Sequence, residues 1–118
     1  IIKVGKVSKV AIDNLPETEE VPLISVSNLK QGIAEGLYEL VDVRRIEERE
    51  AFHIGGKHVP LDRLGEELDQ LPGEKPLVFY CASGKRSGEA VKTIRKQHPD
   101  LKVYSLEGGM KAWKEQQV

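Results

Sequence analysis

The stretch that decides the fold reads Leu77-Val78-Phe79-Tyr80-Cys81-Ala82-Ser83-Gly84-Lys85-Arg86-Ser87. Its first four residues form a short apolar run, typical of a strand in a parallel sheet, and a helical pattern begins near Ser87. The only cysteine of the chain, Cys81, is therefore predicted at a strand-to-helix turn. In open parallel sheets such turns bind ligands, because the first N–H groups of the helix have no partner within it.

The loop that follows Tyr80 has the composition of an anion-binding turn. Backbone N–H groups can converge on one atom there, because three residues in a row are small: Ala82, Ser83 and Gly84. The helix start adds about half a positive charge, and Lys85 and Arg86 add two full ones. A helix N-terminus and nearby cations lower the pKa of a cysteine from about 8.5 to roughly 3.5–7.5. We therefore expect Cys81 to be a thiolate at neutral pH.

Apolar runs alternate with helical patterns on both sides of this loop. Strands are expected at 23–26, 38–43, 58–60, 77–80 and 101–106, with a helical segment after each. Strands that alternate with helices in this way predict an α/β fold. The predicted architecture is a doubly wound five-stranded parallel sheet with right-handed crossovers and helices on both faces.

Three helices carry specific local predictions. In the first, Ser27 is the expected cap, and Leu29 and Ile33 share a face. The segment 45–52 is expected to be a solvated helix with Ile46 and Phe52 as its apolar anchors. The third helix follows Pro60, with Asp62 as its cap and four leucines at helical spacing: Leu61, Leu64, Leu68 and Leu71.

Residues 1–22 are predicted to be an extension or linker outside the domain, which then spans 23–118. Residues 1–12 alternate loosely enough for a small hairpin or edge strand. The segment 14–22 holds two prolines and three glutamates, a composition typical of linkers. Because the chain begins with Ile1 rather than methionine, we expect that it was trimmed or cut from a longer protein.

Composition narrows the function classes. A chain of 118 residues with a net charge of −1 suits one domain without bulk attraction to nucleic acid or to an anionic membrane. Apolar runs are short and no signal peptide is recognisable, so the expected compartment is the cytosol. A lone cysteine makes neither an internal disulfide nor a thiolate-rich metal site. We expect no metal and no cofactor.

Three further segments contain short sequence motifs. Residues 39–44 end in Asp42-Val43-Arg44, residues 106–113 contain Gly108-Gly109 and end in Trp113, and residues 53–61 begin His53-Ile54-Gly55. Together with the cysteine loop, they resemble the rhodanese family of sulfurtransferases, with its Asp-x-Arg strand, its Gly-Gly-x-x-x-Trp signature and its His-Ile-Pro-Gly segment. Gly55 stands where the family commonly has proline. The resemblance covers about residues 23–114.

The resemblance implies a sulfurtransferase in which Cys81 takes sulfane sulfur from thiosulfate or a protein persulfide. The resulting Cys81 persulfide passes its sulfur to cyanide, a small thiol or a protein acceptor. The substrate-binding residues would be Ala82, Ser83, Gly84, Lys85, Arg86 and Ser87. We expect the Arg86 fork to bind loop carbonyls and a bound oxyanion. Ser87 is interpreted as a hydrogen-bond donor to the sulfur or as a helix cap, and Asp42 and Arg44 as braces for loops near the site.

Four alternatives stay open. Cysteine phosphatases also seat a thiolate in a loop closed by arginine, but with five intervening residues, whereas four separate Cys81 from Arg86. A Cys/His protease pair is formally possible, although the histidines show no evident partnership with Cys81: His53, His58 and His98. A non-catalytic docking module would be expected to have lost its nucleophile. The chain also resembles the C-terminal rhodanese domain of adenylyltransferases that sulfurate a ubiquitin-like carrier protein in molybdopterin or thiamin pathways.

Overall fold

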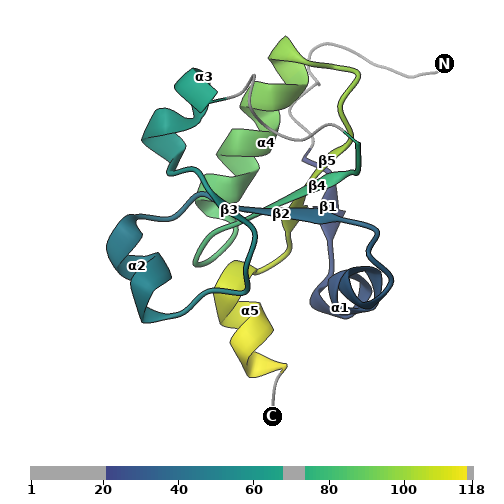
Figure 1. The fold of residues 1–118 in the computed structure, drawn as a ribbon, viewed down its shortest axis with the longest axis vertical. Helices are drawn as coiled ribbons and strands as arrows, with labels where there is room; N and C mark the ends of the chain where they lie inside the picture. Colours follow the sequence, from purple (N-terminus) through teal and green to yellow (C-terminus); the bar gives the residue numbers. More distant parts are fainter. Residues whose placement is uncertain (1–20, 68–73, 117–118) are drawn as a thin grey trace, which may run out of the picture.

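The computed structural model describes residues 21–67 and 74–116. Its centre is one sheet of five strands, β1 to β5, arranged in the order β1-β5-β4-β2-β3 (Figure 1). Their bounds are β1 Leu23–Ile24, β2 Glu39–Asp42, β3 Lys57–His58, β4 Leu77–Tyr80 and β5 Val103–Leu106. All four pairings are parallel. The five-stranded parallel sheet predicted from the sequence is confirmed.

Helices cover both faces of this sheet, as predicted. Their bounds are α1 Val26–Ala34, α2 Ile46–Ala51, α3 Leu64–Glu67, α4 Lys85–Gln97 and α5 Gly109–Glu115, with a 3-10 turn over Leu61–Arg63 before α3. Alternate residues of β4 point to opposite faces. Leu77 and Phe79 pack in the cluster that contains α3 and α4, whereas Val78 and Tyr80 pack in the cluster with α1 and α5. All four residues of β4 are buried, which explains their continuous apolar run.

The start of α1 differs from the prediction. Ser25, not Ser27, is the N-cap, and its hydroxyl accepts a hydrogen bond from the Asn28 amide at 3.1 Å. The strand therefore stops at Ile24, two residues earlier than expected. Leu29 is buried as predicted, but Ile33 is 39% exposed, so Ile33 does not share the buried face.

The helix α2 is solvated, as predicted, but its expected apolar anchors are wrong. Ile46 and Phe52 are 50% and 43% exposed, and α2 contains no buried residue. Polar contacts hold this segment instead, including a hydrogen bond of 3.0 Å from the Arg45 amide to Glu48 Oε1. The two apolar residues of this surface segment therefore do not pack in the core.

Two other predictions concern chain ends and caps. Asp62 lies inside the 3-10 turn, whose N-cap is Pro60, so Asp62 is not the expected cap. Leu68 and Leu71 lie outside the described residues, as do the possible hairpin over 1–12 and most of the linker over 14–22. The predicted boundary between an extension at 1–22 and a domain at 23–118 stays a prediction.

Candidate active site

The sulfur of Cys81 lies at the start of α4, directly after β4. Two backbone amides donate to it, Gly84 N at 3.0 Å and Ser87 N at 3.3 Å. The helix begins at Lys85, two residues earlier than predicted, with Gly84 as its N-cap at φ 102°. Gly84 has no side chain to accept from the first turn, and the sulfur of Cys81 occupies that acceptor position. The candidate nucleophile therefore also caps the longest described helix.

The start of α5 fixes the orientation of the loop peptides. The amide of Met110 donates to the Cys81 carbonyl at 2.8 Å, and the amide of Lys111 donates to the Ala82 carbonyl at 3.0 Å. The Ala82 carbonyl shares its peptide plane with the amide of Ser83, and the Ser83 amide is one of the groups that lower the pKa of Cys81. The contact requires Gly109, because a Cβ there would lie 2.4 Å from the Cys81 carbonyl oxygen and its φ is +60°. The sequence analysis found the glycine pair but not this role.

The hydrogen bonds decide the ionisation of Cys81. Burial raises the pKa of its thiol, but the Ser87 side chain and the amides of Ser87, Gly84 and Ser83 outweigh this, and the pKa is lowered from 9.0. The Ser87 hydroxyl lies 3.5 Å from the sulfur. Because Ser87 is a buried residue inside α4, it is not the helix cap, and the alternative of a hydrogen-bond partner to the sulfur holds.

The sulfur is also closed to solvent: Cys81 is fully buried. We expected a sulfur within a ring of amides, and backbone amides do surround it. Any small molecule must displace covering groups to reach it. The side chains on the outer side of the loop are more open, since Ser83 and Lys85 are exposed and Ala82 is half-buried.

We expected Arg86 to bind the loop carbonyls, but its guanidinium lies elsewhere. Its guanidinium forms a bidentate ion pair with Glu48 of α2, with Nη1–Oε1 and Nη2–Oε2 distances of 2.8 and 2.9 Å. The hydrogen bonds from Arg86 are the main cause that lowers the pKa of Glu48 to about 2. Sequence reasoning missed Glu48 as a site residue, because a contact across 38 positions leaves no local pattern.

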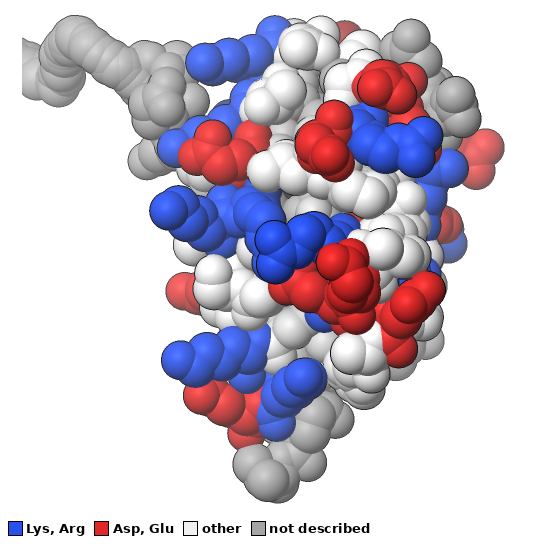
Figure 2. All heavy atoms as spheres, turned by 90° about the vertical axis from the view of Figure 1, so that its left-hand side faces the viewer, with Lys and Arg blue, Asp and Glu red and all other residues white. Residues whose placement is uncertain are grey.

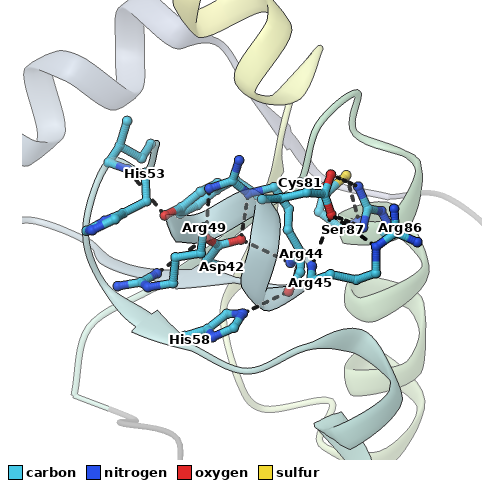
Figure 3. A network of polar contacts seen from close by, with 12 residues as sticks. Asp42, Arg44, Arg45, Arg49, His53, His58, Cys81, Arg86 and Ser87 are labelled. Carbon is cyan, nitrogen blue, oxygen red and sulfur yellow. Dashed lines mark hydrogen bonds and ion pairs between the residues drawn. The ribbon is translucent and has the colours of Figure 1, made fainter. Parts of the chain in front are cut away.

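Asp42 and Arg44 form a buried charge network beside the loop (Figure 3). Asp42 Oδ1 accepts from Arg44 Nε at 2.9 Å, and Oδ2 accepts from Arg44 Nη2 at 3.0 Å and from Arg49 Nη1 at 3.3 Å. Burial raises the pKa of Asp42, but the hydrogen bonds and charges of the arginines lower it overall. Arg44 also donates to the Phe52 carbonyl at 2.6 Å, and Arg49 to the Gly56 carbonyl at 2.9 Å. These contacts tie β2 to the 52–56 segment.

Two histidines lie near this charge network (Figure 3). His58 Nε2 lies 2.8 Å from the Arg44 carbonyl, and His53 Nδ1 accepts from the Gly55 amide at 2.9 Å. In Figure 3 both lie on the opposite side of Asp42 from Cys81. Neither histidine therefore acts on Cys81 in this arrangement, which removes the support for a Cys/His pair between them and Cys81.

A pocket of about 400 Å³ borders the loop at Ala82. Its lining comes from the segment after β2, from α2, from the loop and from α5: Arg44, Glu48, Ala51, Ala82, Met110, Lys111 and Lys114. Glu48 is the acidic residue of this lining, and its charge is paired with Arg86. The lysines therefore give the pocket a local positive field. Acidic and basic side chains lie side by side on the face that carries α2 and α3 (Figure 2).

Membrane-spanning helices and metal-binding clusters are two other features sought in the described residues. Within 21–67 and 74–116, no helix has the length and apolar character needed to cross a bilayer. Over the same residues, no group of three or more histidine, cysteine, aspartate or glutamate side chains could hold a metal ion.

Comparison with known sequences identifies relatives of this chain. The family described as "Rhodanese-like domain" matches residues 25–116. "Putative sulfurtransferase YtwF" of Bacillus subtilis is 37% identical over 97 residues, which cover 80% of this chain and 91% of YtwF. "Putative sulfur carrier protein YrkF" of the same organism is 35% identical over 95 residues, which cover 79% of this chain. The chain spans about half the length of YrkF, 51%.

Solved structures share the fold. A rhodanese-related protein from Thermoplasma volcanium superposes with a TM-score of 0.74 at 28% identity, covering 80% of this chain and 92% of that one. The family match, the relatives and the fold agree with the rhodanese resemblance of the sequence motifs.

Proposed function

This chain belongs to the Rhodanese-like domain family, and from that premise we propose that it transfers sulfane sulfur through a persulfide on Cys81. The observation that carries the proposal is the sulfur of Cys81 as the acceptor of the Gly84 and Ser87 amides at the start of α4. This environment favours the thiolate, which is the nucleophilic form of cysteine.

The first half-reaction loads the sulfur. The Cys81 thiolate attacks the sulfane sulfur of thiosulfate, a new S–S bond forms, and the S–S bond of thiosulfate breaks. Sulfite leaves with the electron pair, and Cys81 becomes a persulfide anion. The same amides would also stabilise the negative charge of the persulfide.

The second half-reaction unloads it. Cyanide or a thiolate attacks the outer sulfur of the persulfide, and the Cys81 thiolate leaves. This sequence contains one cysteine, so the persulfide has no partner within the chain. The acceptor is a separate small nucleophile or a protein, and a ubiquitin-like sulfur carrier is one such protein acceptor.

The pocket beside Ala82 is the proposed approach for the anionic donor. Lys111 and Lys114 of α5 line it, together with Arg44. Their charges attract thiosulfate locally, although the chain as a whole carries a net charge of −1. Because Cys81 is buried, the donor must part the side chains over the loop, among them the Arg86–Glu48 pair.

The test is the intact mass of the protein after incubation with thiosulfate. We expect a gain of one sulfur atom that cyanide removes as thiocyanate, and no gain in Cys81→Ser, which keeps the size of the side chain but not its reactivity. An unmodified wild-type mass would contradict sulfur carriage. Release of phosphate from an aryl phosphate by the same preparation would instead support the phosphatase alternative.

A further inference from the structure

A second hydroxyl lies behind Ser87. Ser105 of β5 is fully buried, and its Oγ is 2.6 Å from Ser87 Oγ. Ser87 is fully buried as well. Buried positions of a parallel strand usually carry apolar residues, and a buried hydroxyl is costly unless it has a hydrogen-bond partner. Ser105 therefore needs an explanation, and the contact with Ser87 supplies it.

The Ser87 hydroxyl has one proton and three neighbours. Its Oγ lies 3.5 Å from Cys81 Sγ, 3.2 Å from the Gly84 carbonyl and 2.6 Å from Ser105 Oγ. A thiolate and a carbonyl can only accept, whereas a second hydroxyl can either donate or accept. The direction of the Ser87 proton therefore depends on what Ser105 does.

We propose that Ser105 is a positioning residue for Cys81: its hydroxyl donates to Ser87 Oγ and so leaves the Ser87 proton for the sulfur. With the thiolate present, the chain of hydrogen bonds runs from Ser105 to Ser87 to Cys81, and each hydroxyl donates once. When Cys81 is protonated, its S–H can donate to Ser87, and Ser87 can then donate to the Gly84 carbonyl. The serine pair thus stabilises the charged sulfur by a reversal of proton direction rather than by movement of heavy atoms.

This arrangement deepens the proposed sulfur transfer, on which its catalytic value rests, but it acts on the ionisation of Cys81 alone. Charged and titratable groups lie on the elements around the loop: Tyr80 of β4, Asp42 of β2, Arg44 just after β2, Glu48 of α2, Lys85 and Arg86 of α4, and Lys111 and Lys114 of α5. The substitution Ser105→Ala changes none of them. A change in titration that depends on Ser87 therefore reports the hydroxyl pair.

The experiment is a pH titration of the Cys81 thiolate by its ultraviolet absorbance, with the matched Cys81→Ser variant as baseline. This chain has one cysteine, so the signal belongs to Cys81. In Ser105→Ala we expect the pKa of Cys81 to rise, so that the thiolate fraction on the acid side of the midpoint falls about threefold to tenfold, the effect of one lost hydrogen bond. In a Ser87→Ala background the same substitution is expected to change nothing. No shift in Ser105→Ala, or an equal shift in both backgrounds, would overturn the proposal.

Ser105→Thr keeps the hydroxyl and serves as the second variant if Ser105→Ala does not fold. We expect it to titrate like the wild type, and a raised pKa in folded Ser105→Thr would overturn the proposal. The titration uses no sulfur donor or acceptor. Failure of sulfur loading with a normal Ser105 dependence would therefore count against the proposed function, and normal loading without that dependence against the role of Ser105.

Discussion

Two acidic groups lie at the carboxyl ends of neighbouring strands, and the protein surrounds them differently. Asp42 ends β2, and Cys81 follows β4, in a register that pairs Asp42 with Tyr80. The Asp42 carboxylate accepts from two guanidinium groups. The Cys81 sulfur accepts from amides and lies beside a hydroxyl.

The difference separates a charge that braces the fold from the proposed nucleophile. An ion pair with bidentate geometry fixes both partners and occupies the lone pairs of the carboxylate. Amide dipoles stabilise charge without forming an ion pair, so the sulfur keeps an electron pair for bond formation. Arg86, at the end of the loop, forms its ion pair with Glu48 and not with the sulfur. Substitutions in the two regions are therefore expected to differ in how much stability they cost.

The largest expected effect is on stability, from Asp42→Ala. It leaves Arg44 buried without its carboxylate, and breaking a buried pair in this way costs about 3–5 kcal/mol. Urea unfolding at neutral pH measures the loss. Two controls frame it. Glu39 lies on the same strand as Asp42 and forms an exposed 4.0 Å ion pair with Lys75. Glu39→Gln removes this pair and should cost less than about 1 kcal/mol. Cys81→Ala removes the cap of α4 and should cost about 1 kcal/mol. A loss in Asp42→Ala no larger than in Cys81→Ala would erase the distinction.

The same contrast shows how far the sequence could predict the structure. The strand β4 matches its predicted bounds, because four consecutive apolar residues are buried on both faces of the sheet. The strand-to-helix turn, with amides directed at Cys81, was predictable from the small residues after Cys81. Ser25 and Ser27 both suit a cap, and only the backbone conformation decides between them. The partners Glu48 and Ser105 could not be found, because each reaches the loop through tertiary packing: Glu48 from a solvated helix, and Ser105 from a strand that reads as apolar.

An intermediate effect is expected where α5 meets the loop. In Gly109→Ala the new Cβ would lie 2.4 Å from the Cys81 carbonyl oxygen, and the backbone must shift in a conformation that L-residues rarely adopt. We expect a loss of about 1–3 kcal/mol. A weaker grip on the loop carbonyls should also raise the pKa of Cys81. Thermal unfolding and the thiolate titration measure the two effects.

Gly88→Ala is the matched control for that substitution. Gly88 lies within α4, and an added Cβ there meets no atom within 4 Å. Alanine should therefore stabilise the helix by about 0.5–1 kcal/mol. If Gly109→Ala proved as harmless as Gly88→Ala, the contact between α5 and the loop would not be what orients the amides.

The smallest expected effect concerns Glu48, and its sign follows from linkage. Because the pKa of Glu48 is about 2 in the folded protein and 4.5 ordinarily, the folded state favours the carboxylate. The stability this adds is fully present above pH 4.5 and is lost as the pH falls toward about 2. The pair is partly exposed, so Glu48→Gln should cost only about 1 kcal/mol at pH 7. Urea unfolding of both proteins across this range should show their difference shrink with acid, whereas a difference independent of pH would mean that Glu48 acts through packing. The substitution also removes the carboxylate partner of Arg86. Glu48→Gln therefore also tests whether Arg86, without an ion pair like that of Asp42, disturbs the loop around the sulfur.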